Sequence, residues 1–317
     1  MSPGIPLRET ATAENFDEQA YLRGNPDVAA AVASAAVPSG RVHFEVFGLA
    51  EGRQIQHDHE HIAIQKRRKI ERIRPLCRTD MHFVETDQCL NFLTKEFSEK
   101  FSITETEAVS SNNYDGNVRS LIERHREGLI LDCGAGSRPD YHDNVVNFEI
   151  ADYLSTDIRG VGEQLPFIND SFDAVISMAV LEHVKDPFAC AKEIARVLKP
   201  GGELICCVPF LQPYHGYPSH YYNMTHQGIR NLFEPYLEIT DVTVEQSVLP
   251  IWTLTWIVGS WCEGLTGKVR DDFLNRRLSE FVGDPRQLGL LDQAFVTQLS
   301  PEKNFELASA FVLFARK

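Results

Sequence analysis

The sequence lacks cysteines at metal-ligand spacing. Its seven cysteines stand singly or as the adjacent pair Cys206 and Cys207, and no CxxC motif occurs. An odd number of cysteines without such spacing indicates reduced thiols, most of them in buried strands. The opening residues MSPGIPLRETATAENF also lack the apolar segment of a secretory signal. The expected location is therefore the cytoplasm.

The sequence also lacks an excess of basic residues over acidic ones. The chain of 317 residues has 31 lysines and arginines against 45 acidic residues, which gives a net charge of −14. Phosphate binding needs a basic surface, so we expect no nucleic-acid partner. One basic run, KRRKIERIR (66–74), spreads its charges over several faces of an expected helix. That pattern favours a solvated helix over a phosphate or anionic-lipid site.

No apolar run is long enough for a membrane span, which needs about 20 residues. The most apolar late stretch is SVLPIWTLTWIVGSWC (247–262), and Pro250 and Gly259 interrupt it. We expect no transmembrane segment and interpret this stretch as a buried or lid helix. Its three tryptophans leave open a membrane-surface contact or an apolar substrate wall.

A glycine-rich loop after a buried strand organises the middle of the chain. In LILDCGAGSRP (129–139) a short apolar run meets an acidic residue, and Gly134 and Gly136 follow. Glycines at such a position let the backbone come close to a ligand, although a plain tight turn shows the same pattern.

The segments downstream alternate between strands and helices. They are a strand ending in an acid, VVNFEI (145–150); a turn into an aromatic, GEQLPF (162–167); a strand that runs into Glu182 and His183, SFDAVISMAVLEHV (171–184); and a helix, a break and a further strand, DPFACAKEIARVLKPGGELICCVPF (186–210). Apolar strands that alternate with helices predict an α/β fold with a parallel sheet covered on both faces.

The order and spacing of these motifs resemble the class I S-adenosylmethionine-dependent methyltransferases. The resemblance covers residues 125 to 240 and is strongest to the type 11 group, which carries the LPF, VLEHV and RVLKPGG signatures. It implies a Rossmann-like, mostly parallel sheet with an antiparallel last strand, here ELASAFVLFARK (306–317), and a strand at 238–248. It also implies S-adenosyl-L-methionine as cofactor and a methyltransferase activity of class EC 2.1.1. Only 11 residues separate Cys133 from Val145, so the first helix is expected to be a stub.

The resemblance places the cofactor across the carboxyl ends of the strands. It implies these cofactor-binding residues: Asp132, Gly134, Gly136, Arg138, Glu149, Gly162, Glu163 and Met178. Glu149 is expected to accept both ribose hydroxyls, and Asp132 to set the loop and attract the ammonium group. For Arg138 two readings stay open, a contact with the ligand carboxylate and a surface ion pair.

One position in the adenine loop departs from the family. The family commonly has an acid four residues before the leucine of LPF, and this chain has Val161 there. We expect adenine to depend on the backbone at Gly162, on Glu163 or on Asp157. The loss of one hydrogen bond is typically worth about 1 kcal/mol, which weakens the cofactor without excluding it.

Histidines and tyrosines gather after the fourth and fifth strands, in VLEHV and in PFLQPYHGYPSHYYNMT (209–225). The candidates for a catalytic base are His183, His215 and His220. The candidates for acceptor binding are Tyr214, Tyr217, Tyr221 and Tyr222. Each histidine alone also fits a structural role. No metal is expected, because transfer from a sulfonium does not require one.

We predict four regions along the chain. They are a disordered tail at 1–15, a small helical module at 16–53, a linker and helical region covering the cofactor site at 54–127, and the methyltransferase domain at 128–317 with a helical insertion at about 249–300. The run HDHEH (57–61) has metal-ligand residue types, but a linker gives them no fixed geometry.

The module at 16–53 has a resemblance of its own. Its pattern of YL, NPDV, HF and GLAEGR resembles a short helical module of bacterial surface-layer proteins and polysaccharide-assembly enzymes. This implies a protein partner in glycan machinery. The alternative is a helical cap on the main domain.

The expected function is O-methylation of a small or glycan-linked acceptor in polysaccharide or secondary metabolism. Two alternatives stay open. The short first crossover and Val161 favour a catalytically inactive scaffold or binding protein with the methyltransferase fold. The tryptophan-rich segment favours a methyltransferase that acts on a quinone-like or lipid acceptor.

Overall fold

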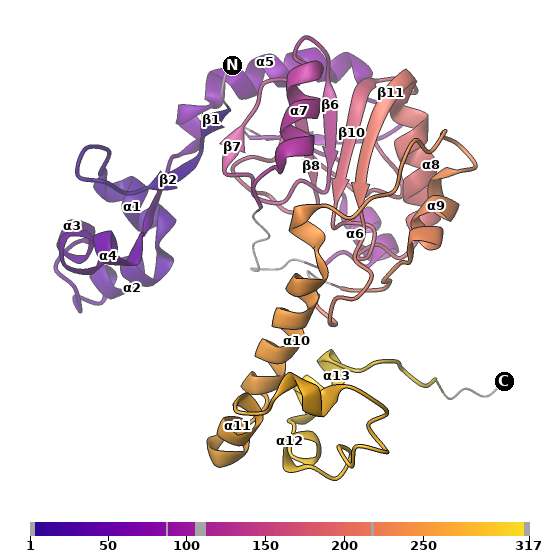
Figure 1. The fold of residues 1–317 in the computed structure, drawn as a ribbon. Helices are drawn as coiled ribbons and strands as arrows, with labels where there is room; N and C mark the ends of the chain where they lie inside the picture. The colour runs from indigo at the N-terminus through magenta and orange to yellow at the C-terminus, as the bar shows by residue number, and fades with distance from the viewer. Residues whose placement is uncertain (1–3, 87, 105–111, 217–218, 314–317) are drawn as a thin grey trace.

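A seven-stranded sheet forms the centre of the protein (Figure 1). The structure is a computed structural model and describes residues 4–86, 88–104, 112–216 and 219–313. The strand order is β11-β10-β6-β8-β9-β5-β4, and every neighbouring pair is parallel except β4 and β5. The strands are Val84–Glu85 (β4), Leu90–Asn91 (β5), Ile130–Cys133 (β6), Val145–Glu149 (β8), Ile158–Arg159 (β9), Phe172–Met178 (β10) and Leu198–Cys207 (β11). The expected Rossmann-like, mostly parallel sheet is confirmed.

Helices cover both faces of this sheet. Two apolar clusters hold them there, one beneath α5 (Ala63–Ile73), α8 (Pro187–Val197) and α9 (His226–Phe233), the other beneath α7 (Gly116–Arg124). Because both faces are covered, successive apolar residues of the central strands are buried, as in Ile130 and Leu131.

Helix α5 is the basic run, and two of its lysines are buried. Lys66 Nζ donates to the Thr156 carbonyl at 2.6 Å, and Lys69 Nζ donates to the Val145 carbonyl at 2.6 Å and to Asp157 at 2.9 Å. These oxygens lie where β8 and β9 begin, so the ammonium groups satisfy carbonyls at the amino ends of the strands. The expectation of a fully solvated helix is therefore wrong for this face of α5.

The amino-terminal helices form a packed unit of their own, left of the sheet in Figure 1. Its core contains Tyr21, Val28, Phe44 and Ile55 and has no residue of the sheet. The unit thus has its own core and is not a cap on the sheet. Its helices are Glu18–Gly24 (α1), Pro26–Ala33 (α2), Gly40–His43 (α3) and Leu49–Glu51 (α4), with a π-helical turn at Phe44–Gly48.

Short strands tie this unit to the main sheet. Strand β2 (Arg8–Thr10) pairs with β3 (Gln54–Gln56), and β1 (Ile5–Pro6) pairs with β7 (Asp140–Tyr141). The prediction of a disordered tail to residue 15 is therefore wrong from residue 4 onward, and residues 1–3 lie outside the described part of the chain. Between β6 and β8 the described residues 134–144 contain β7 and no helix, so the expected stub is absent.

The region at 54–127 is less helical than expected. Besides α5 and α7 it contains α6 (Lys95–Phe101), and residues 90–91, expected in a helix, form β5. Strand β5 extends the sheet beside β9, and β4 pairs antiparallel with it at the edge. The antiparallel strand of this sheet is therefore β4, at the opposite edge from β11.

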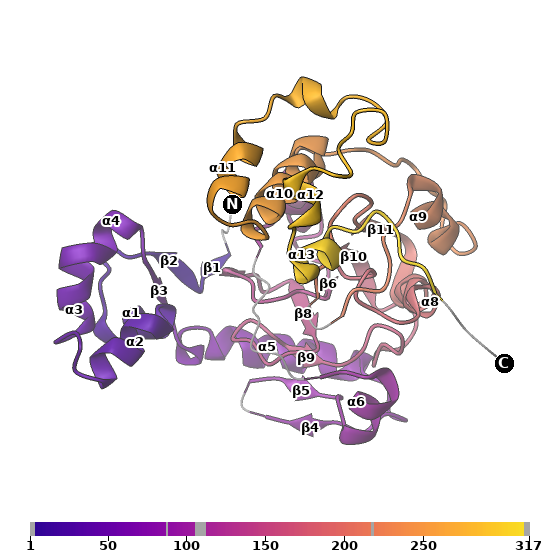
Figure 2. The same ribbon diagram turned by 90° about the horizontal axis from the view of Figure 1, so that it is seen from below.

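The carboxyl-terminal residues form a helical lobe beside the sheet (Figure 2). Its helices are Pro250–Glu263 (α10), Gly267–Leu274 (α11), Ala294–Thr297 (α12) and Pro301–Glu306 (α13). The predicted strand at 238–248 is wrong, because these residues are irregular apart from a 3₁₀ turn at Gln246–Val248. The predicted last strand is absent from the described residues 307–313, and residues 314–317 lie outside them. The described residues 307–313 follow α13 and do not pair with β11. They therefore make no hydrogen bonds of a β-sheet.

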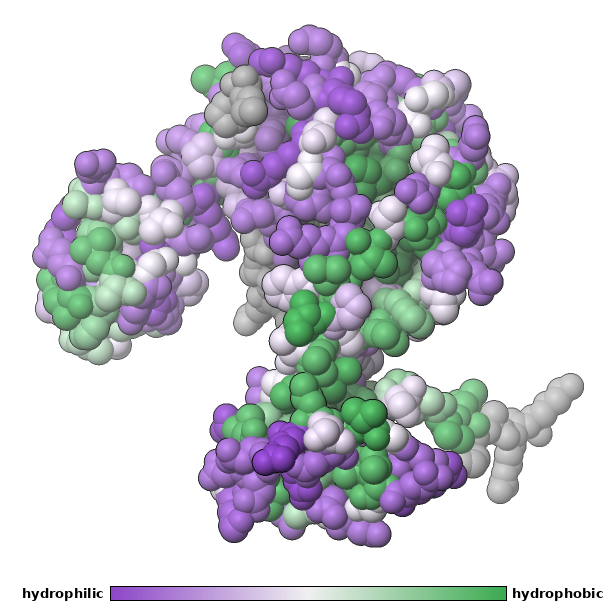
Figure 3. Space-filling model, viewed as in Figure 1, coloured by the Kyte–Doolittle hydropathy of each residue, from purple (hydrophilic) through white to green (hydrophobic). Residues whose placement is uncertain are grey.

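Helix α10 is mostly apolar and largely exposed, and Figure 3 shows its apolar surface on the face in view. Ile251 and Trp252 are 55% and 60% exposed, and only the end of the helix, at Ser260 and Cys262, is buried against the lobe. The prediction of a buried helix is therefore wrong over most of its length. Among the described helices, none combines the length and apolar character that a membrane crossing requires.

Candidate active site

The loop after β6 brings two predicted residues together with a third on β8. Gly134 and Gly136 adopt φ values of +84° and +63°, which other residues rarely adopt. A Cβ atom on Gly134 would lie 2.4 Å from Val180. Gly136 N–H donates to Glu149 Oε2 at 2.8 Å. The loop therefore lies directly against the carboxylate that ends β8.

Glu149 is held in place by backbone donors. Its Oε1 accepts the Ile150 N–H at 2.8 Å, while Oε2 accepts Gly136 N–H. Burial raises the pKa of Glu149, and these N–H groups oppose the rise by stabilising the carboxylate. Oε1 also accepts the Ala151 N–H at 3.4 Å, whereas Oε2 keeps a further lone pair with which the group is still able to accept a hydroxyl donor.

Asp132 and Arg138 form a buried ion pair. Arg138 Nε and Nη2 donate to the two oxygens of Asp132 at 2.8 and 3.2 Å, and Tyr114 donates its hydroxyl to Asp132 at 2.6 Å. Arg138 is only 5% exposed, so its reading as a surface ion pair is wrong. Asp132 is committed to these donors, and its expected attraction of an ammonium group stays a prediction. The position of Tyr114 before the first strand suggests a lid contact, whereas its bond to Asp132 is not predictable from the sequence.

Some of the residues on the adenine side of the predicted site are buried and cannot contact a ligand. Asp157 is fully buried and accepts from Tyr141 Oη at 2.5 Å, Asn147 N at 2.9 Å and Lys69. It supports the sheet and does not face a ligand, so its proposed adenine contact is wrong. Val161 is buried as well.

Three further residues were predicted to bind the cofactor: Gly162, Glu163 and Met178. A Cβ atom on Gly162 would come 3.1 Å from Cys190 Sγ. Glu163 is half-buried, which raises its pKa, and the backbone N–H groups of residues 185 and 186 oppose the rise. Met178 ends β10 and is half-buried. The roles of these three residues toward a cofactor stay predictions.

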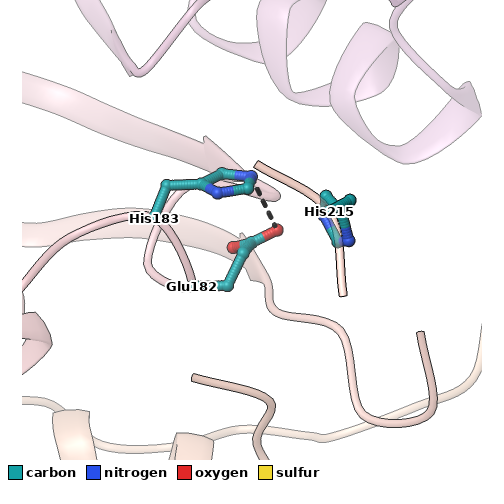
Figure 4. Close-up of side chains that lie close together, drawn as sticks. All are labelled: Glu182, His183 and His215. Carbon is teal, nitrogen blue, oxygen red and sulfur yellow. Dashed lines mark ion pairs between the residues drawn. The ribbon is translucent and has the colours of Figure 1, made fainter. Parts of the chain in front are cut away.

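A second cluster lies after β10, where the chain turns at Ala179 with a φ of +56°. Figure 4 shows Glu182, His183 and His215 side by side. His183 Nε2 lies 3.8 Å from Glu182 Oε1, and the two imidazole rings are 5.2 Å apart. The loop after β11 folds back onto this turn, because Tyr221 N–H donates to the Glu182 carbonyl at 2.6 Å. The structure thus brings two of the three candidate bases, His183 and His215, close together.

Hydrogen bonds set the tautomers of the histidines. His183 Nδ1 lies 2.5 Å from the Ser219 carbonyl, and His215 Nδ1 lies 2.9 Å from the Pro213 carbonyl. A carbonyl only accepts, so each Nδ1 carries a proton and each Nε2 keeps its lone pair. Burial lowers the pKa of both rings, which keeps them neutral near pH 7.

His220 differs from the other two. Its Nδ1 accepts His215 N–H at 3.1 Å, so the neutral ring carries its proton on Nε2, 2.9 Å from Asn223 Oδ1. Both ring nitrogens are engaged. His183 and His215 are therefore the candidates that retain a free nitrogen for proton transfer.

No functional role was predicted for Glu182 from the sequence. It is fully buried, and burial raises the pKa of its carboxyl to about 8. Neither of its oxygens has a hydrogen-bond partner among the described residues. The sequence places it next to His183 but gives no sign of its burial.

A pocket of about 530 Å³ opens beside His215. Tyr214 stacks on His220 with a ring separation of 5.8 Å and meets the edge of Phe305 at 5.6 Å. Tyr221 and Tyr222 are both 41% exposed near this loop, and Tyr217 lies outside the described residues. The pocket is lined by Tyr214, His215, Gly216, Glu302, Phe305 and Glu306. The three residues from α13 had no signal in the sequence, because about 90 residues separate them from the tyrosines.

Part of the chain matches a known family. Residues 134–206 match the family model described as a methyltransferase domain. A putative methyltransferase of Encephalitozoon cuniculi is 32% identical over 108 residues, which cover 29% of this chain and 51% of that protein. An uncharacterized methyltransferase of Mycobacterium tuberculosis is 40% identical over 68 residues, 20% of this chain and 27% of that protein. The chain thus spans about half or less of the length of these relatives.

Solved structures align with parts of the chain at low sequence identity. A putative methyltransferase from Bacillus halodurans is 17% identical and has a TM-score of 0.31, with 38% of this chain and 68% of that chain covered. The YcgJ protein of Bacillus subtilis is 16% identical with a TM-score of 0.32, covering 49% and 87%. Residues 134–206 therefore resemble a methyltransferase domain, and the relatives that match parts of the chain are methyltransferases by name.

Proposed function

We propose that the chain transfers a methyl group from S-adenosyl-L-methionine to an oxygen of a small or glycan-linked acceptor. The observation that carries this proposal is the placement of two groups at one edge of the sheet. Gly136 and Glu149 follow β6 and β8, and the His183 and His215 pair follows β10 and β11. Parallel strands bring their carboxyl ends to a common edge, where open α/β sheets bind ligands.

The residues present fit the cofactor. The Glu149 carboxylate would accept the ribose hydroxyls, and the backbone at Gly134 and Gly136 would lie against the methionine and ribose parts. Arg138 reaches this region from its pair with Asp132 and would face the ligand carboxylate. The cofactor itself supplies the activated methyl group on its sulfonium.

The free nitrogens of the histidines suit proton removal from a hydroxyl. S-adenosylmethionine, when bound, would supply the methyl group to the acceptor oxygen and would keep the electron pair of the broken carbon–sulfur bond on its sulfur. The hydroxyl proton goes to Nε2 of His183 or His215. The Nδ1–H bonds to the Ser219 and Pro213 carbonyls then stabilise the imidazolium.

The acceptor side combines aromatic and polar groups. Tyr214 and Phe305 supply aromatic faces, and Glu302 and Glu306 supply hydrogen-bond acceptors on the pocket wall. This mixture suits a ring that carries several hydroxyls. The pattern of the module at 16–53 supports a link to glycan machinery, with that module as the docking site for a protein partner.

A transfer assay tests this function. Purified protein is incubated with S-adenosylmethionine and a panel of sugars, nucleotide sugars and oligosaccharides, and S-adenosylhomocysteine and the methylated product are followed by mass spectrometry. We expect acceptor-dependent formation of both. Failure of every hydroxylated acceptor with a folded protein would contradict the proposal.

A quinone-like or lipid acceptor is the second candidate, and one contact favours it. The ring of Trp256, on the exposed apolar helix α10, lies 5.3 Å from His215. The same assay with a phenolic quinol in detergent micelles distinguishes the two. Product from the quinol alone, reduced by Trp256→Ala, would favour the apolar acceptor.

A further inference from the structure

We propose that Glu182, His183 and His215 form a binding site for a divalent transition-metal ion. One ligand atom from each residue lies within 4.8 Å of the others. An ion about 2.1 Å from each of three tetrahedrally arranged ligands holds any two of them about 3.4 Å apart. Side-chain movements of about 0.7 Å per residue, by this estimate, would close the site around an ion.

The buried carboxylate is the first argument for an ion. Glu182 is 0% exposed, and both of its oxygens lack a hydrogen-bond partner among the described residues. His183 Nε2, at 3.8 Å, is beyond hydrogen-bond distance. A carboxylate without a partner in such a place is costly, and buried charges in proteins are usually paired or bound to a metal. A cation between Glu182 and the histidines supplies the missing partner.

The orientation of the histidines is an independent argument. Both direct Nδ1–H at a backbone carbonyl, at 2.5 Å from Ser219 and 2.9 Å from Pro213. A metal-bound histidine characteristically donates its other ring N–H to a carbonyl or carboxylate in this way, which fixes its tautomer and ring orientation. The remaining Nε2 lone pairs are the ligands that a metal takes.

The ligand set defines the class of ion. Two imidazoles and one carboxylate suit Zn²⁺, Co²⁺, Fe²⁺ or Mn²⁺, whereas Ca²⁺ and Mg²⁺ prefer sets made of oxygen alone. Three protein ligands leave coordination positions open for a water or an acceptor oxygen. An oxygen bound there would lose its proton more readily, and this would replace proton removal by the Nε2 lone pairs, which the ion then occupies. That role rests on the proposed function, whereas the metal site itself does not.

Titration of the full chain with Co²⁺ tests the site directly, because bound Co²⁺ absorbs in the visible range. We expect the wild-type protein to bind one equivalent with ligand-field bands, and Zn²⁺ to displace it. Glu182→Gln keeps the side-chain volume and removes the charge, and His215→Gln removes one imidazole. Each is expected to weaken binding at least tenfold and to abolish the rise in melting temperature that Zn²⁺ gives the wild type.

A control separates this site from surface histidines. His57 and His61 stack at 4.3 Å and would bind added metal adventitiously. The double variant His57→Gln/His61→Gln is expected to keep the Co²⁺ spectrum and affinity. Three results would each overturn the site. They are loss of the Co²⁺ spectrum in this control, equal Co²⁺ affinity in the wild type and Glu182→Gln, and no Co²⁺ binding by the folded wild type.

Cofactor binding is measured in parallel, so that the two proposals fail separately. S-adenosylhomocysteine titrated into metal-free Glu182→Gln reports the cofactor site without the metal. Retained cofactor affinity with lost Co²⁺ binding supports the metal site. Cofactor binding in every sample without any Co²⁺ binding overturns the metal site and leaves the methyltransferase function standing.

Discussion

Lys69 and Asp157 form an ion pair beneath the sheet, with both side chains almost completely inaccessible. Asp157 also accepts from Tyr141 and Asn147. Because removal of one partner leaves the other charge buried, we expect Lys69→Met to destabilise the protein by about 3 kcal/mol near pH 7. Urea unfolding followed by circular dichroism measures this loss. Glu71→Gln, a change on the same helix, is the control and should leave stability nearly unchanged.

The same pair predicts a pH dependence. Burial lowers the pKa of Lys69 to about 8 in the folded protein, while the unfolded chain titrates near 10.5. Between these values the unfolded chain holds more protons, so the Lys69 contribution to stability rises with pH. The wild-type unfolding free energy minus that of Lys69→Met should therefore increase from pH 8 to pH 10. A flat or falling difference would contradict the assignment.

His183 carries a kinetic prediction. Under the proposed function, His183→Gln removes a free nitrogen from the acceptor side, and we expect kcat to fall by roughly 10²-fold or more. The cofactor dissociation constant should stay within about twofold, since Glu149 ends β8 whereas His183 follows β10 on the other side of β6. His226→Gln, at an exposed position, serves as the control. Equal losses of turnover and cofactor affinity would make His183 structural.

Single residues were predictable where a strand and a glycine loop fix the backbone. Gly134, Gly136 and Glu149 lie together as expected, because strand order alone determines the edge at which they meet. The burial of Lys69 was not predictable. Lys69 lies in a run of mostly charged residues, 66–72, and only the packing of α5 under the sheet reveals which lysines face inward.

At the scale of elements, the loop after β6 depends on a glycine without a side chain. A Cβ atom on Gly134 would meet Val180 at 2.4 Å, and the φ of +84° is strained for alanine. Gly201 has a similar φ of +78°, and nothing among the described residues lies within 4 Å of its Cβ position. We therefore expect Gly134→Ala to cost about 2 kcal/mol more than Gly201→Ala in urea unfolding. Equal costs would show that the loop relaxes freely.

The strands with buried neighbours on both sides were predictable from their apolar runs, as β6, β8 and β10 show. The edges of the sheet were not. Residues 90–91 lie in the region 54–127, which was predicted to be mainly helical. Pairing with β9 makes them a strand. Residues 307–313 have the pattern of a strand and lack a partner in the described part of the chain.

At the scale of the whole molecule, the amino-terminal helices are expected to unfold apart from the main sheet. Tyr21 is fully buried in their core, and its hydroxyl lies 3.0 Å from His43 Nδ1. Tyr21→Ala should destabilise this unit by about 3 kcal/mol and leave the transition of the sheet in place. Differential scanning calorimetry should then show a lower first transition and an unchanged second one. A single transition that shifts as a whole would contradict the separate core.

The central claim is that the carboxyl edge of the sheet binds S-adenosylmethionine through Glu149. Calorimetric titration of the wild type, Glu149→Ala and the exposed control Glu238→Ala measures this most directly. We predict micromolar binding to the wild type and the control, and a loss of at least tenfold for Glu149→Ala. Equal affinity in all three would contradict the role of Glu149. No binding to folded wild-type protein would contradict the enzyme and favour a scaffold with this fold.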